Sequence, residues 1–305
     1  MLRWRLISAA IILSIILSSF WLDVQIGKET WAGSPGMITS LLTLLIGLVA
    51  ANEVVSFNPQ ANAGVKRWAV YCGTGLVICL ACYPAFHPDY PPDCPIGRLG
   101  WPLLGMGGAV GLAFISKMIG YRPGDQVMDD VARTVLVVAY IGLLISFWAP
   151  IRSLVDNVWG LVALLSLYVT VKFSDTGAYA VGRTFGKTKL APQLSPGKTV
   201  EGLIGGIGGG CLGAFFVFYL LAPQLTGQQT AATWWQILLF AVVVTIVGIV
   251  GDLCESLLKR DGGVKNSSRW LPGLGGVMDI IDSLLPAGPV VYAFWVTGWF
   301  GPVSS

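Results

Sequence analysis

The chain has 305 residues, of which 54% are hydrophobic and only 11% are charged, and its formal net charge is +3. Soluble domains carry about 25% charged residues, so this composition excludes an ordinary soluble protein and indicates a membrane protein. The small net charge gives no reason to expect nucleic-acid binding. His87 is the only histidine, which excludes Ser-His-Asp and Cys-His catalysis and metal sites built from several histidines.

Apolar runs recur along the whole chain, and each approaches the roughly 20 residues that a helix needs to cross a bilayer. Because backbone groups must be hydrogen-bonded inside lipid, we predict an all-α, polytopic integral membrane protein with about nine transmembrane helices. The first run lacks a small-x-small cleavage site, so we expect it to be retained as a helix. In chain order the predicted spans are roughly 6–22, 35–51, 67–86, 99–117, 131–149, 157–174, 200–222, 233–251 and 277–300.

The basic residues are distributed unevenly over the predicted loops. If the N-terminus lies in the cytoplasm, only Lys28, Arg98 and Arg152 fall on the outer side, and the other sixteen of the 19 lysines and arginines fall on the inner side. This asymmetry follows the positive-inside rule and predicts an outer C-terminus. The two strongly basic loops of the C-terminal half then face the cytoplasm.

Two regions differ in their loops. Residues 1–150 consist of hydrophobic spans joined by short, chemically plain connections, and we predict an N-terminal transmembrane region there. Residues 151–305 contain two long polar segments between spans, and we predict that this C-terminal transmembrane region carries the chemistry. Ionisable residues concentrated between membrane segments are a functional-site hypothesis by default.

The first polar segment, residues 174–202, is predicted to be a basic loop punctuated by glycine. It contains the string PGKT, which is reminiscent of a phosphate-binding P-loop. A P-loop requires glycine five residues before Gly197, where this chain has Pro192, so that interpretation fails. We expect Lys198 and Arg183 to neutralise the charge of a triphosphate or of a lipid phosphate.

The second polar segment, Asp252 to Asp282, contains five of the sixteen acidic residues and four of the 19 basic residues. Its first part continues the eighth span as a helix. Asp252, Glu255, Ser256 and Lys259 follow one another at spacings that place them on one helix face. We expect this face to present a carboxylate and an ammonium group to the same ligand; the alternative is a surface salt bridge between Glu255 and Lys259.

The end of this segment combines glycines with two carboxylates. The glycines of residues 271–276 let a ligand approach the main chain, and a helix that begins near Val277 would offer free N–H groups to an anion. Asp279 and Asp282 follow three residues apart, on one helix face. Two carboxylates that enter a membrane helix together are expected to need neutralisation by a metal ion.

Both segments resemble a known family. The pattern S-x-x-K-R…K…LPG-x-GG-x-x-D-x-x-D, here Ser256 to Asp282, resembles the signature of the phosphatidate cytidylyltransferases, or CDP-diacylglycerol synthases. The upstream block from Ser174 to Gly202 is similar to the preceding block of that family. The two blocks cover about 60 residues in the family's order, whereas the first half of the chain agrees only in hydropathy.

The resemblance implies an integral membrane enzyme that transfers CMP from CTP to phosphatidic acid, gives CDP-diacylglycerol and pyrophosphate for phospholipid biosynthesis, and requires Mg²⁺. It suggests a homodimer. With the distribution of basic residues, we expect a multi-pass protein of the cell inner membrane whose active site faces the cytoplasm. The expected partners are CTP, phosphatidic acid and the bilayer, with no nucleic acid.

Spacing and resemblance together define the candidate site residues by three roles. The candidates for metal binding are Asp252, Asp279 and Asp282. The candidates for catalysis are Asp252, Ser256, Lys259, Lys265 and Asp279. The candidates for nucleotide or phosphate binding are Arg183, Lys198, Arg260, Arg269, Gly273, Gly275 and Gly276.

The chain departs from the family pattern at four positions. Asn266 stands where the family usually has Asp, Ser268 where it has Gly, Leu274 where it has His, and Ile280 where it has Arg. A mechanism that needs those side chains would not apply here. Three alternatives therefore stay open: CMP transfer to another lipid phosphate, a CTP-dependent lipid kinase, and a non-catalytic membrane relative.

Overall fold

The computed structural model describes residues 14–16, 18–26, 36–87, 90–91, 93–155, 157–265, 267–268 and 275–302. The protein divides into two compact units, and each is formed by two stretches of the chain. The first unit comprises Met1–Pro150 and Leu258–Ile280; the second comprises Ile151–Leu257 and Ile281–Ser305. The predicted regions 1–150 and 151–305 were defined by their loops and stay a prediction; the compact units also change at residue 150, but residues 258–280 belong to the first unit.

The predicted all-α membrane fold is confirmed. Among the described residues, eight helical stretches are long and apolar enough to cross a bilayer. A shorter apolar helix, Ser14–Ile26, covers the end of the first predicted span, and residues 6–13 and 17 of that span lie outside the described residues. The eight stretches are Met37–Val55, Arg67–Phe86, Gly97–Met118, Val127–Arg152, Asn157–Phe185, Val200–Thr226, Trp234–Asp261 and Met278–Val296.

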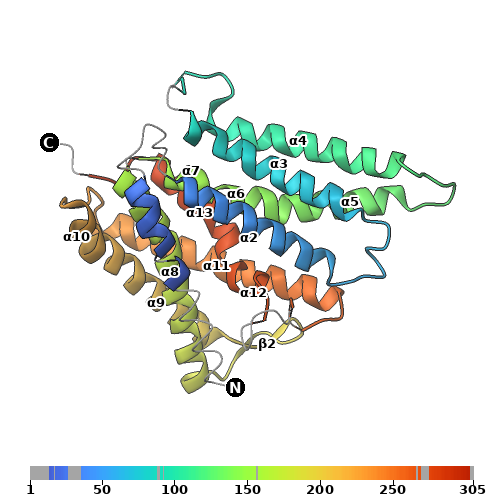
Figure 1. Ribbon diagram of the computed structural model, residues 1–305. Helices are drawn as coiled ribbons and strands as arrows, with labels where there is room; N and C mark the ends of the chain where they lie inside the picture. The colour runs from blue at the N-terminus through green and yellow to red at the C-terminus, as the bar shows by residue number, and fades with distance from the viewer. Residues whose placement is uncertain are drawn as a thin grey trace. The chain divides into compact units, whose positions relative to one another are not determined.

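Long apolar helices form the first unit. The helices α2 (Met37–Val55), α3 (Arg67–Phe86), α4 (Gly97–Met118) and α5 (Val127–Val137) follow one another, and each contacts the next (Figure 1). The π-helical segment η1 (Val138–Leu143) continues α5, and the short helices α6 (Leu144–Ser146) and α7 (Trp148–Arg152) follow. The short helix α12 (Met278–Ile281), from the other end of the chain, also begins in this unit.

The helices of the first unit approach closely at a glycine and are tied at one end by an ion pair. A Cβ atom at Gly105 would lie 2.7 Å from the Cα of Val77, so only glycine lets α4 approach α3 at this depth. Lys117, at the end of α4, pairs with Asp130 of α5 at 2.6 Å, and both side chains are buried. Burial excludes water from this pair, so breaking it would leave one uncompensated charge.

The second unit begins with a pair of long helices. α8 (Asn157–Phe185) and α9 (Val200–Phe216) pack along their lengths, and a Cβ at Gly209 would overlap the carbonyl oxygen of Phe173. The unit continues with η2 (Val217–Leu221), α10 (Ala222–Thr226), α11 (Trp234–Asp261) and α13 (Leu284–Val296). Aromatic rings in contact form part of its core: Phe218 stacks on Trp295 and Phe300, and Phe240 meets Phe218 edge to face.

One prediction about this unit was wrong. Residues 174–185, expected to begin a loop, extend α8 to Phe185. At 1.5 Å per residue a helix of 29 residues is about 44 Å long, so α8 exceeds the roughly 30 Å hydrocarbon core. Packing against the glycine-rich face of α9 stabilises these last turns, although their residues are too polar for a hydropathy reading to include them.

A short hairpin connects α8 to α9. Its strands, β1 (Lys189–Ala191) and β2 (Ser195–Thr199), are antiparallel. The side chain of Thr199 caps α9 by accepting the N–H of Gly202 at 3.0 Å. The carboxylate of Glu201 accepts the N–H groups of Lys187 and Thr188 at 3.1 Å, which ties the beginning of the hairpin to the first turn of α9.

Candidate functional site

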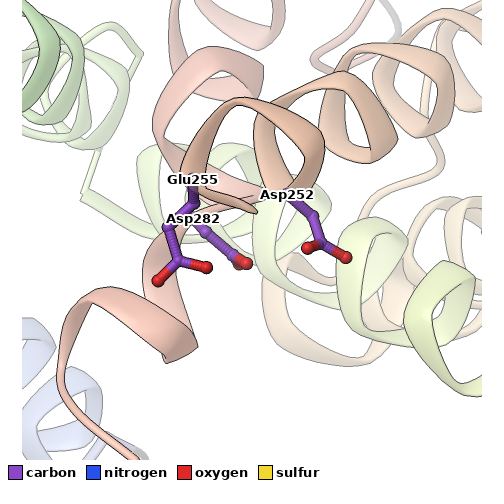
Figure 2. A group of neighbouring side chains, drawn as sticks. All are labelled: Asp252, Glu255 and Asp282. Atoms are coloured by element: carbon purple, nitrogen blue, oxygen red, sulfur yellow. The ribbon is translucent and has the colours of Figure 1, made fainter. Parts of the chain in front are cut away.

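Three carboxylates of the second unit gather beside α11. Asp252 and Glu255 come from α11, and Asp282 comes from the turn between α12 and α13. One oxygen of each lies within 4.8 Å of the others, and the three side chains project into the same space beside the helix (Figure 2). We call Asp252, Glu255 and Asp282 the acidic group.

Local packing explains why these residues meet. Asp252 and Glu255 are three residues apart and therefore share a face of α11. Asp282 is held against that helix because Gly251 offers no side chain: a Cβ there would lie 2.6 Å from the carbonyl oxygen of Asp282 and 2.5 Å from Pro286. The Ser283 N–H donates to Asp282 Oδ1 at 2.6 Å, which orients this carboxylate at the beginning of α13.

Lys198 joins the acidic group from the hairpin. Its Nζ lies 2.8 Å from Asp252 Oδ2 and donates to the carbonyl oxygen of Ile249 at 3.3 Å. The predicted phosphate-binding lysine is therefore beside a predicted metal-binding carboxylate. An ammonium group at this place could pair with a phosphate that approaches the same carboxylates through a shared cation.

The chemistry of the acidic group suits a hard divalent cation. Magnesium prefers oxygen ligands and is bound through a small number of carboxylates together with phosphates and water. Glu255 and Asp282 are buried, and neighbouring buried carboxylates repel one another when ionised. A divalent cation would relieve this repulsion, so the side chains present fit the Mg²⁺ that the sequence led us to expect.

Asp279 belongs to the first unit and has a different environment. Its Oδ1 lies 2.8 Å from Lys259 Nζ. Its Oδ2 accepts hydrogen bonds from the Ser267 hydroxyl at 2.5 Å, the Ser267 N–H at 3.0 Å and the Gly276 N–H at 2.8 Å. The prediction that Asp279 shares a cation with Asp252 and Asp282 stays a prediction.

The beginning of α12 was predicted to offer free N–H groups to an anion. The N–H groups at its first residue and just before it instead meet carboxylates of the protein itself: Gly276 donates to Asp279, and Val277 and Met278 donate to Glu53 at 3.1 and 2.8 Å. Gly275 has a left-handed backbone, with φ of 95°, which a residue with a side chain rarely adopts. The assignment of Gly275 and Gly276 to phosphate binding remains a prediction.

The other predicted site residues lie in several places. Ser256 is half-buried on α11, and Arg260 and Lys265 are exposed near the end of that helix and just after it. Arg183, near the end of α8, is exposed and donates to the hydroxyl of Tyr179 at 2.5 Å. Ser268 and Ile280 are described, whereas Asn266, Arg269, Gly273 and Leu274 lie outside the described residues.

Three residues that contact or complete the predicted site were absent from the prediction: Glu255, Ser267 and Glu53. Glu255 had a signal, because its spacing from Asp252 placed both on one helix face. Ser267 had a weaker one, a hydroxyl within the polar segment. Glu53 had none, because it lies near the end of an apolar helix and its contacts are more than 220 residues away along the chain.

Comparison with known proteins identifies the family. The model of the cytidylyltransferase family matches residues 4–297. The phosphatidate cytidylyltransferase of Pseudomonas aeruginosa is 32% identical over 304 residues, which cover 99% of this chain and 100% of that protein. That of Haemophilus influenzae is 41% identical over 140 residues, 46% of this chain and 48% of that protein. That of Staphylococcus epidermidis is 31% identical over 260 residues, 84% of this chain and 89% of that protein. The resemblance seen in the two polar segments is thus confirmed, and the chain belongs to the cytidylyltransferase family.

Proposed function

We propose that this protein transfers CMP from CTP to phosphatidic acid and forms CDP-diacylglycerol and pyrophosphate. The observation that carries this proposal is the family match along almost the whole chain, in a multi-pass membrane protein. The acidic group supports it, because oxygen ligands gathered in this way suit the cation that accompanies a nucleoside triphosphate. The reaction belongs to phospholipid biosynthesis.

The chemistry places modest demands on the side chains. A phosphate oxygen of phosphatidic acid attacks the α-phosphorus of CTP, a new P–O bond forms, and the bond to the β-phosphate breaks to release pyrophosphate. The attacking oxygen is already anionic, so no strong general base is required. This agrees with the position of the single histidine, His87, which lies outside both polar segments. Catalysis then depends on orientation and on stabilisation of negative charge.

We assign cation binding to the acidic group, Asp252, Glu255 and Asp282. When bound, Mg²⁺ would neutralise charge on the phosphates of the nucleotide. Lys198, held beside Asp252, is proposed to pair with a phosphate oxygen at that place. Ser256, on the same helix as Asp252, is proposed to donate a hydrogen bond to a phosphate.

The first unit is proposed to supply further positive charge. Lys259, Arg260, Lys265 and Arg269 are assigned to phosphate binding from their positions in the family signature. Lys259 is already oriented by Asp279, and Ser267 and Gly276 hold that carboxylate in turn. A side chain fixed in this way loses little conformational entropy when it meets a ligand.

The direct test is pyrophosphate release from CTP and phosphatidic acid by the purified protein in detergent, with and without Mg²⁺. We expect release that requires both substrates and stops when the metal is chelated. Release only with another lipid phosphate would assign a different acceptor. Formation of CDP without pyrophosphate would indicate a lipid kinase, and no reaction with any lipid phosphate would indicate a non-catalytic relative.

We also propose that the protein lies in the cell inner membrane with its active site toward the cytoplasm, on the basis of the basic loops. Lys187 and Lys189 are exposed in the hairpin segment, so trypsin should cleave there in inverted membrane vesicles and not in right-side-out vesicles. The homodimer suggested by the family resemblance stays a prediction, which light scattering in detergent tests.

A further inference from the structure

Glu53 connects α2 to the end of the family signature. The residue lies near the C-terminal end of α2, and its side chain is buried. Its Oε1 accepts the N–H of Val277 at 3.1 Å, and its Oε2 accepts the N–H of Met278 at 2.8 Å. A buried carboxylate in a membrane helix is costly unless it is well paired. Two charge-assisted hydrogen bonds to consecutive amides provide such pairing.

A second contact ties the same end of α2 to the other side of the segment. Gly262 lies just after α11, and a Cβ atom there would be 2.7 Å from the carbonyl oxygen of Phe57. Phe57 follows α2 by two residues. The end of α2 therefore contacts the protein chain on both sides of residues 263–276, the stretch that contains most of the predicted phosphate-binding residues of the signature.

Glu53 and Asp279 have two neighbours in common, Ser267 and Gly276. A Cβ atom at Gly276 would overlap the Ser267 hydroxyl and both carboxylate oxygens of Glu53. The Ser267 hydroxyl and the Gly276 N–H both donate to Asp279, which pairs with Lys259. A shift of the backbone at residues 277 and 278 would thus displace Asp279, the next residue, from its donors.

We infer that Glu53 is a positioning residue for the reaction: it holds the amides of Val277 and Met278 so that Asp279 keeps Lys259 in place. This inference rests on the proposed function, because the importance of Lys259 and Asp279 is assigned from it. It gives the N-terminal half of the chain a specific part in catalysis, whereas the sequence indicated only membrane spans and plain loops there.

The test compares Glu53→Gln and Glu53→Ala with the wild-type protein, all full-length and purified in detergent. The glutamine side chain has the same length but only one acceptor oxygen, so one of the two amides must lose its partner. We expect kcat per folded molecule to fall by about tenfold in Glu53→Gln and by up to about 100-fold in Glu53→Ala, the range seen when residues that orient metal or substrate ligands are removed. The KM for phosphatidic acid should change little.

Hydrogen–deuterium exchange provides a readout that does not depend on activity. The amides of Val277 and Met278 should exchange faster in Glu53→Gln, while amides elsewhere in the first unit keep their wild-type rates. The matched control is Asp130→Asn, which removes another buried carboxylate of the same unit whose partner is Lys117. Asp130→Asn should lower the thermal midpoint yet leave kcat per folded molecule and exchange at residues 277 and 278 unchanged.

The outcomes separate the inference from the proposed function. If Glu53→Gln keeps the wild-type kcat, or if exchange at residues 277 and 278 does not change, the inference is overturned. If Asp130→Asn lowers kcat as much as Glu53→Gln does, Glu53 acts only through stability and the inference is again overturned. If the wild-type protein itself releases no pyrophosphate, the proposed function fails, and exchange still shows whether Glu53 holds the two amides.

Discussion

The carboxylates of the two units are stabilised in opposite ways. In the second unit, Asp252, Glu255 and Asp282 each place an oxygen within 4.8 Å of the others, so carboxylate faces carboxylate, and Lys198 pairs with Asp252. In the first unit, Asp279 and Glu53 meet N–H, hydroxyl and ammonium donors. The first arrangement favours a cation that comes from outside the protein, whereas the second is completed by the protein itself.

This difference shows that the few acidic residues of the chain have two roles: some are arranged to bind a cation, and others hold the protein's own donors in place. Carboxylates that repel one another weaken the empty protein and strengthen it when a divalent cation binds. Carboxylates that accept several donors hold the backbone and the basic side chains in a fixed arrangement. Replacing Glu255 or Asp282 by its amide should therefore affect stability in the opposite direction from replacing Asp279 or Glu53, even where both replacements lower activity.

The largest effect is expected in the acidic group. Replacement of Asp252 or Asp282 by Asn should lower pyrophosphate release by on the order of 1,000-fold, because a metal ion supplies several kcal/mol of charge stabilisation. For Asp282→Asn, the thermal midpoint measured without metal should stay the same or rise, since a repelling charge has been removed. Asp252→Asn also loses the ion pair with Lys198, so its midpoint does not test the repulsion. Near-wild-type turnover in either variant would show that the acidic group does not bind the catalytic cation.

The next effect is expected at Asp279. The Asp279→Asn variant should lose the ion pair with Lys259 and part of its hydrogen bonding. Activity should fall by about 10- to 100-fold, and unlike the acidic-group variants this one should lose about 1–3 kcal/mol of stability. Thermal melting in chelator measures the second quantity, and an unchanged midpoint would contradict the environment described for Asp279.

The Asp279 prediction has a control within the same pair. Lys259→Met removes the other partner, so the double variant should be less destabilised than the sum of the two single variants. Additive losses would mean that Lys259 and Asp279 stabilise the protein independently of each other.

A smaller effect is expected from added volume at Gly276. In Gly276→Ala, the new methyl group would overlap Ser267 and Glu53, and we expect a loss of about 1–3 kcal/mol from overpacking. The matched control is Gly208→Ala in α9, where a Cβ atom meets nothing within 4 Å. That variant should be neutral or more stable, because alanine favours helix more than glycine does. Equal midpoints for the two variants would contradict the close contacts at Gly276.

Hydropathy predicted most of the fold because lipid imposes one requirement on every span. The span predicted at 67–86 coincides with α3, Arg67–Phe86. The prediction failed at the end of α8, where Lys172, Asp175 and two glycines interrupt the apolar pattern and the helix nevertheless continues to Phe185. Packing against α9 stabilises those turns. The contact is with a helix that lies further along the chain, so the local sequence pattern of α8 does not indicate it.

The candidate site was predictable where its residues are close in sequence. Asp252 and Asp282 were found from charge and spacing, and Glu255 was visible on the same helix face. Glu53 could not be found, because its hydrogen bonds join residues separated by 224 and 225 positions. From sequence, a single acidic residue at the end of an apolar span indicates only the boundary between membrane and water. Its role becomes visible in the structure, where residues 277 and 278 contact it.

A metal-dependent shift in stability distinguishes the two kinds of carboxylate most directly, and it leaves the chain itself unchanged in the wild-type measurement. Mg²⁺ at 100 times its dissociation constant should stabilise the wild-type protein by about 2.7 kcal/mol, seen as a rise of a few degrees in the thermal midpoint. Glu255→Gln should abolish that rise, because it removes an oxygen ligand from the acidic group. Asp279→Asn should retain it, since the oxygens of Asp279 already accept from Lys259, Ser267 and Gly276. If the rise disappears in Asp279→Asn as well, Asp279 exchanges those donors for the cation, as its place in the sequence alone predicts. The contrast between the two units would then hold only for the metal-free protein.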